Sequence, residues 1–123
     1  MKTTLVIITM MMLIASMGCK KETNPQKISE KIISVSLMKS DTLYKYSFGY
    51  FGTEEGISII KQARHSAVST IINQPWEERF FQYQPLNNFT GLDTVVIETA
   101  KGSDGALKPD LINKTIFIFE MNH

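Results

Sequence analysis

Cysteine is nearly absent from this chain: among its 123 residues the one thiol belongs to Cys19. A single cysteine cannot close a disulfide within the chain, and thiolate metal sites need several such ligands. Histidine is scarce too, because His65 and His123 are the only two and lie far apart in the sequence. We therefore expect no metal and no other cofactor, and an apolar core must supply the stability of the fold.

An excess of charge of either sign is also lacking. The chain has 13 basic and 12 acidic residues, for a formal net charge of +1. Lys2 is the single basic residue before Cys19, so the chain from Cys19 onward is balanced. Binding to a phosphate backbone requires a basic stripe, which such a composition does not provide. Nucleic acid is therefore not an expected partner.

Residues in a catalytic arrangement are lacking as well. The sequence contains no serine in a glycine-flanked elbow and no cysteine–histidine pair. The acidic pairs Glu54-Glu55 and Glu77-Glu78 cannot present two carboxylates side by side, because adjacent residues of a strand point to opposite faces. A glycosidase needs two carboxylates that flank the scissile bond. We therefore predict a protein without enzymatic activity.

An uncharged, mainly apolar stretch follows Lys2 and extends from Thr3 to Gly18. A positively charged start, a short apolar core and small residues at the end are the parts of a secretory signal peptide. A membrane-spanning helix needs about 20 mainly apolar residues, and the apolar core here, residues 5–17, is shorter. We therefore expect residues 1–18 to be a cleaved signal peptide.

The residues around the expected cleavage site, Ala15-Ser16-Met17-Gly18-Cys19, resemble the lipobox of bacterial lipoproteins. The resemblance implies that Cys19 becomes the first residue of the mature protein and that its thiolate accepts a diacylglyceryl group. It also implies acylation of the new amino group, and two or more acyl chains hold a protein stably in a bilayer. Cys19 is thus the expected site of lipidation and the contact with the membrane.

Residues 19–27 are polar, and we interpret them as a lipidated tether that lifts the folded part off the membrane. Within this tether, Lys20-Lys21-Glu22 resembles the signal by which some Gram-negative bacteria send lipoproteins to the cell surface. These resemblances imply a location in the bacterial cell envelope, at the outer membrane. Which face of that membrane carries the protein is left open.

Beyond Pro25 the sequence has the two-residue period of half-buried strands. The expected strands are residues 31–38, 43–51, 57–61, 67–72, 78–84, 92–99 and 112–121. Over residues 56–73 a partial helical spacing competes, but the β-branched content favours strands. In the last strand either the isoleucines, Ile116 and Ile118, or the phenylalanines, Phe117 and Phe119, face the core, and the pattern does not decide between them.

About seven short strands separated by turn residues predict an all-β fold, a sandwich of immunoglobulin-like type. This domain is expected to cover residues 28–123.

The segment Tyr83-Gln84-Pro85-Leu86-Asn87-Asn88-Phe89-Thr90-Gly91-Leu92-Asp93-Thr94 resembles a recurrent signature of bacterial cadherin-like and immunoglobulin-like modules. Tyr83 and Pro85 end a strand, and proline stops hydrogen-bond donation there. Phe89 can fold back to plug the open end of the sandwich, and Gly91 permits a positive φ. Asp93 can accept backbone N–H bonds that the turn leaves unpaired. We therefore expect these residues to form a structural turn and not a binding site.

Two further patterns are left open. Asp93, Asp104 and Asp110 are candidates for calcium, which related modules sometimes bind, but they are too scattered for an EF-hand loop, and turn capping is favoured. Thr42 and Thr94 each stand in a short Asp-Thr-aliphatic pattern that looks like the O-glycosylation acceptor of exported proteins in some bacteria.

Aromatic residues are more numerous between positions 44 and 83 than a small core needs. Most of them are expected to pack in the core, although a row on one sheet face could stack on sugar rings or anchor a protein. We therefore expect a lipid-anchored envelope protein with a structural, adhesive or partner-binding role. The alternative is a carbohydrate-binding accessory module of a surface glycan-uptake system, which exposed aromatics on a flat sheet face would favour.

Overall fold

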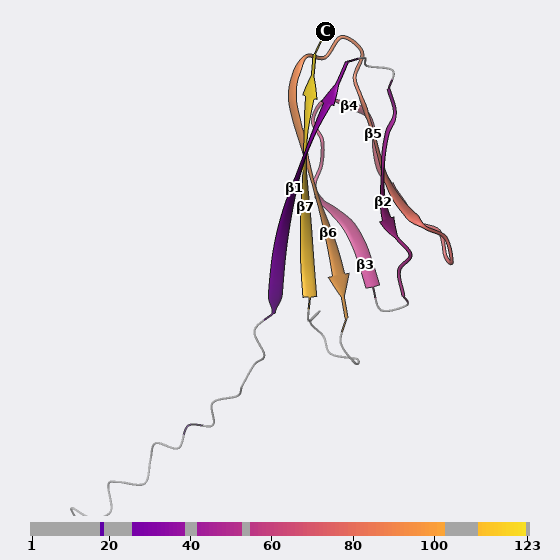
Figure 1. Cartoon of the computed structure of the whole chain (residues 1–123), viewed down its shortest axis with the longest axis vertical. Coiled ribbons are helices and arrows are strands. Elements are labelled where there is room, and N and C mark those ends of the chain that lie inside the picture. The colour runs from indigo at the N-terminus through magenta and orange to yellow at the C-terminus, as the bar shows by residue number, and fades with distance from the viewer. Residues whose placement is uncertain (1–17, 19–25, 39–41, 53–54, 103–110, 123) are drawn as a thin grey trace, which may run out of the picture.

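The computed structural model describes residues 18, 26–38, 42–52, 55–102 and 111–122, and within these residues every regular element is a β-strand (Figure 1). The strands are β1 (Lys27–Leu37), β2 (Tyr44–Gly49), β3 (Glu55–Lys61), β4 (Ser66–Ile72), β5 (Arg79–Pro85), β6 (Gly91–Lys101) and β7 (Leu111–Met121). The prediction of an all-β fold with seven strands is confirmed. Residues 56–73, where a helix was the competing interpretation, form β3 and β4. Within the described part of the chain, no helix is long and apolar enough to cross a membrane.

The strands form two sheets that pack as a sandwich. One sheet has four strands in the order β1-β7-β6-β3, and the other has three in the order β2-β5-β4. All neighbouring strands are antiparallel except β1 and β7, which run parallel along the whole length of β1. An immunoglobulin constant domain instead places its first strand on the sheet that holds the second. The position of β1 is therefore a distinguishing feature of this sandwich.

The core lies between the sheets and is dominated by aromatic rings. The fully buried side chains come from alternate positions of the central strands: Phe81, Tyr83, Pro85, Val95, Ile97, Phe117 and Phe119. The phenylalanines of β7 thus face the core, and Ile116 and Ile118 point outward, which answers the question that the sequence left open. The rings of Tyr83 and Phe119 stack with their centroids 3.8 Å apart. Such ring pairs stabilise a core beyond the burial of their area.

The topology gives the sandwich two distinct ends. At the first end β1 and β7 begin and β6 ends, and the register aligns Lys27, Leu111, Lys101 and Glu55 across the four-stranded sheet. The β2–β3 and β4–β5 connections lie there too (Figure 1), and we call it the tether end because Lys27, the last residue of the expected tether, begins β1 there. The β3–β4 and β5–β6 connections lie at the opposite end, the far end, beside the last residues of β7.

Candidate functional site

The far end is organised around a buried carboxylate, that of Asp93, which is 4% exposed. One carboxylate oxygen accepts the backbone N–H of Arg64 at 2.9 Å, and the other accepts that of His65 at 3.0 Å. The hydroxyl of the buried Tyr83 donates to the same carboxylate at 2.9 Å. Burial and this hydrogen bond raise the pKa of Tyr83, so the phenol stays protonated and donates. These hydrogen bonds replace the water that the buried carboxylate has lost, as a structural role requires.

The predicted turn residues lie beside this carboxylate. Pro85 is fully buried at the end of β5, and Gly91 opens β6 with a φ of +119°. Phe89 is half-buried, packs against the core and stacks on the ring of His65 at 4.3 Å. Arg64 and His65, from the β3–β4 connection, were not identified from the sequence. A buried aspartate needs hydrogen-bond donors from outside its own turn, and this need could have suggested that such partners exist.

A second feature is the outward surface of the four-stranded sheet, where apolar side chains lie beside a row of charged ones, Glu30, Lys114 and Glu98. Alternation from the buried positions directs the following side chains outward: Ile28, Ile32, Leu92, Val96, Ile112, Ile116 and Ile118. We call this surface the outer face. The register aligns Ile32, Ile116 and Val96 as a continuous row across β1, β7 and β6. Ile32 and Leu92 are each 64% exposed. Contiguous apolar surface of this kind marks interaction sites.

A third feature is a group of aromatic side chains at the tether end. Tyr50 is 75% exposed and Trp76 is 91% exposed, so both are accessible and neither belongs to the core. Phe51 lies beneath the guanidinium of Arg79, which is 4.4 Å from the ring centroid. Phe51, Arg79 and Trp76 line a cavity of about 320 Å³ together with Asn73 and Pro75. Aromatic surface next to a cation and an amide can bind an amphipathic or polar ligand.

A tight turn holds Trp76 in its exposed position. The N–H of Glu77 donates to the carbonyl of Gln74 at 3.3 Å, which closes a turn with Pro75 and Trp76 at its centre. Trp76 has a φ of +66°, a value that bulky residues rarely adopt. Glycine or asparagine normally occupies such a position. The turn therefore directs a large apolar side chain into solvent at a conformational cost.

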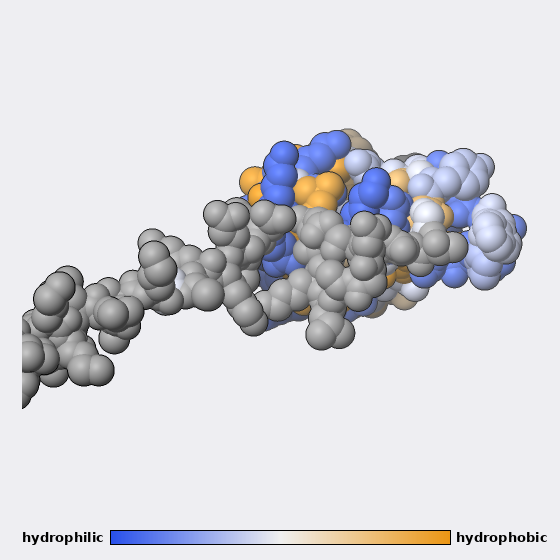
Figure 2. Space-filling model, turned by 90° about the horizontal axis from the view of Figure 1, so that it is seen from below, coloured by the Kyte–Doolittle hydropathy of each residue, from blue (hydrophilic) through white to orange (hydrophobic). Residues whose placement is uncertain are grey.

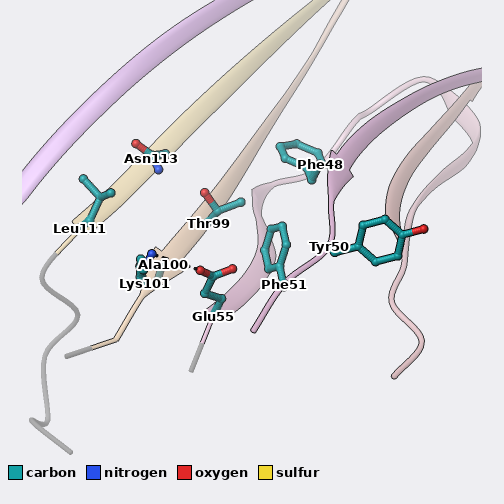
Figure 3. A pocket seen from close by; sticks show the side chains of 9 residues that line it. All are labelled: Phe48, Tyr50, Phe51, Glu55, Thr99, Ala100, Lys101, Leu111 and Asn113. Carbon is teal, nitrogen blue, oxygen red and sulfur yellow. Dashed lines mark ion pairs between the residues drawn. The ribbon is translucent and has the colours of Figure 1, made fainter. Parts of the chain in front are cut away.

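A further cavity of about 230 Å³ opens between the two sheets at the same end (Figure 3). Phe48 and Phe51 line it from one side, and Thr99 and Asn113 line it from the four-stranded sheet. At its edge the ammonium of Lys101 lies 3.6 Å from the carboxylate of Glu55. Figure 2 views the molecule from this end and shows apolar side chains exposed between hydrophilic ones.

Several residues singled out from the sequence do not contribute to these surfaces. Cys19, Asp104, Asp110 and His123 lie outside the described residues. Thr42 is exposed. Within the described part of the chain, no three His, Cys, Asp or Glu side chains gather closely enough to hold a metal ion.

No protein-family model and no curated protein sequence matches the chain. Among solved structures, it resembles part of an endo-fucoidan hydrolase of glycoside hydrolase family 107, with a TM-score of 0.48 and 11% identity. That match covers 73% of this chain and 12% of the hydrolase. It also resembles a cysteine protease inhibitor from Entamoeba histolytica, with a TM-score of 0.43 and 15% identity, over 77% of this chain and 97% of the inhibitor. Neither similarity carries an argument about function.

Proposed function

We propose that this protein is a lipid-anchored component of the bacterial cell envelope, held in the outer membrane through Cys19, and that it acts by binding a partner and not by catalysis. The signal-like residues 1–18 and the lipobox-like sequence before Cys19 support the anchor. The short polar segment between Cys19 and β1 supports a folded domain held close to the membrane. The turn around Asp93 is consistent with a cadherin-like module, the finer fold type that the sequence suggested.

The apolar row on the outer face is the observation on which partner binding rests. Outward residues of a solvated sheet are normally polar, yet Ile32, Ile116 and Val96 are aligned across three strands here. A protein partner that covered this row would remove it from water, and the burial would favour binding by about 25 cal/mol per Å² of apolar surface. The aromatic core also supports this function over sugar binding by a sheet face, because Tyr83, Phe81 and their neighbours are buried.

Photo-cross-linking in intact cells tests the binding role. A photoreactive phenylalanine analogue at position 32 should give one discrete cross-linked product, and the same analogue at position 45 should give none. Lys45 is a matched control because it is exposed on β2, on the outward side of the other sheet. Ile116→Lys should remove the product by placing a charge in the apolar row. Equal products from both positions would argue against the outer face as the interface.

Membrane fractionation tests the anchor. Cys19→Ser should move the protein from the membrane to the soluble fraction and abolish labelling by a fatty-acid probe. Unchanged membrane retention of this variant would show that residues 1–18 remain attached as a membrane helix.

The alternative function is carbohydrate binding at the tether end. It is favoured by the cavity of about 320 Å³ that Trp76, Phe51 and Asn73 help to line, because an aromatic ring and an amide are the groups that contact sugar rings and hydroxyls. Native electrophoresis in gels that contain soluble polysaccharides tests it. A polysaccharide that retards the parent protein but not Trp76→Ala would support this alternative.

A further inference from the structure

We propose that the tether end of the domain docks onto the membrane surface, with Trp76 and Tyr50 inserted at the level of the lipid headgroups. The occupant of this aromatic surface is thus a lipid surface and not a soluble ligand. This inference rests on the proposed lipid anchor at Cys19 and adds an orientation to it.

The exposed aromatic side chains lie at the end of the domain where β1 begins, which is the end nearest the proposed anchor in the sequence. The tether enters β1 at Lys27, and the register places Lys27 in one row with Leu111 and Lys101 at the edge of the sandwich. The connections that carry Tyr50 and Trp76 lie at the same end (Figure 1). Cys19 is eight residues before Lys27, which limits the fully extended separation to about 28 Å. The anchor therefore holds the tether end close to the bilayer.

The side chains at the tether end have the chemistry of a membrane–water interface. Tryptophan and tyrosine are enriched where a protein meets the membrane–water interface, because each combines an apolar ring with a polar group. Trp76 and Tyr50 are the most exposed large apolar side chains among the described residues, at 91% and 75%. Lys27 is exposed at this edge and can extend its ammonium group to lipid phosphates, whereas the ammonium of Lys101 is paired with the carboxylate of Glu55. Glu77, next to Trp76, opposes anionic lipid, so the rings and not the charges dominate this contact.

The backbone conformation at Trp76 also supports docking. A tryptophan with a φ of +66° costs conformational energy that a glycine would not. Strain of this kind persists where an outward-directed side chain has a use, such as a ligand contact. Trp76→Gly should therefore unfold at an equal or higher temperature than the parent protein, because the turn keeps its shape without the strain.

Trp76 also supplies the test, because it is the only tryptophan in the chain. The mature lipidated protein is reconstituted in vesicles of phosphatidylethanolamine and phosphatidylglycerol, with or without bromine atoms on the upper part of the acyl chains. We expect brominated lipid to quench most of the Trp76 fluorescence and the emission to lie at shorter wavelength than in the Cys19→Ser protein in solution.

The control is a protein with Trp76→Phe and Lys45→Trp, which moves the fluorophore to the start of β2, away from the tether end. Its fluorescence should be insensitive to bromine. Equal quenching of the two proteins, while both sediment with the vesicles, overturns docking and leaves the anchor intact. A protein that does not sediment overturns the anchor and docking together. A shift of the Trp76 emission by soluble polysaccharide, without quenching by lipid, overturns docking in favour of the glycan alternative.

Discussion

Asp93 shows at the scale of single residues how this sandwich accommodates a buried charge. Its carboxylate has lost nearly all contact with solvent, and two backbone N–H groups from a distant connection and one phenol replace the water. An uncompensated carboxylate in this position would be strongly destabilising. The hydrogen bonds also join β6 to the β3–β4 connection and to β5, so one side chain joins three parts of the chain.

Asp93→Ala should lower the free energy of unfolding by roughly 1–3 kcal/mol, because it leaves buried donors without an acceptor. Tyr83→Phe removes one of these donors and keeps the ring, so it should cost less, about 1 kcal/mol. Urea denaturation of both variants measures the difference. An Asp93→Ala protein as stable as its parent would contradict the structural role of this carboxylate.

Alkaline pH should destabilise the domain through Tyr83. Burial raises the pKa of this phenol above its ordinary value, so above pH of about 10 the unfolded chain releases a proton that the folded chain keeps. The free energy of unfolding should then fall by up to about 1.4 kcal/mol per pH unit, and no such loss should occur at lower pH. Urea denaturation as a function of pH measures this slope. An unchanged slope in Tyr83→Phe would argue against this assignment.

At the scale of the element, β7 has two apolar faces with different surroundings. Phe117 is fully buried in the core, whereas its neighbour Ile116 lies on the outer face. Phe117→Ala should therefore cost about 3–5 kcal/mol. Ile116→Thr, a β-branched replacement on the outward side, should change the free energy of unfolding by less than about 1 kcal/mol. Chemical denaturation distinguishes the two, and equal losses would show that the strand faces are assigned wrongly.

The connection between β5 and β6 contributes to stability through Phe89 and through Gly91, the residue at which β6 begins. Phe89→Ala should cost about 2 kcal/mol, less than a fully buried phenylalanine, because Phe89 is half-buried and shares its contact with His65. Gly91→Val should cost roughly 1–3 kcal/mol, because its φ of +119° strains any side chain. Thermal unfolding measures both. Loss of partner binding at unchanged stability would identify this turn as a recognition loop instead.

The strands were predictable because apolar and polar residues alternate in β2 and in the second half of β1, and because β6 is rich in β-branched residues. In β7 the alternation fails, since Ile116 on the outer face is as apolar as Phe117 in the core. The apolar residues of the outer face thus remove the alternation from which the buried side of β7 could have been predicted.

The sequence indicated that Asp93 needs donors, but Arg64 and His65 become its neighbours only through the packing of β3 and β4. The exposure of Trp76 was not predictable, because the residue that follows proline in a turn can be either buried or exposed.

At the scale of the whole molecule, the domain should fold without help from a metal or a disulfide. The core residues of both sheets contact one another directly, and Cys19 lies outside the domain. A soluble fragment of residues 26–123 should give a circular dichroism spectrum of β-structure with little helix. Its melting temperature should not change when a chelator is added. A chelator-dependent melting temperature would point to a bound ion.

The parallel pairing of β1 with β7 has a mechanical consequence. β1 begins at one end of the sandwich, and β7 finishes at the other, with the two strands in register along all eleven residues of β1. A force applied between the start of β1 and the end of β7 would slide β1 along β7. All the hydrogen bonds between β1 and β7 then bear the load at the same time, instead of breaking one after another. The domain is therefore suited to resist tension applied between the start of β1 and the end of β7.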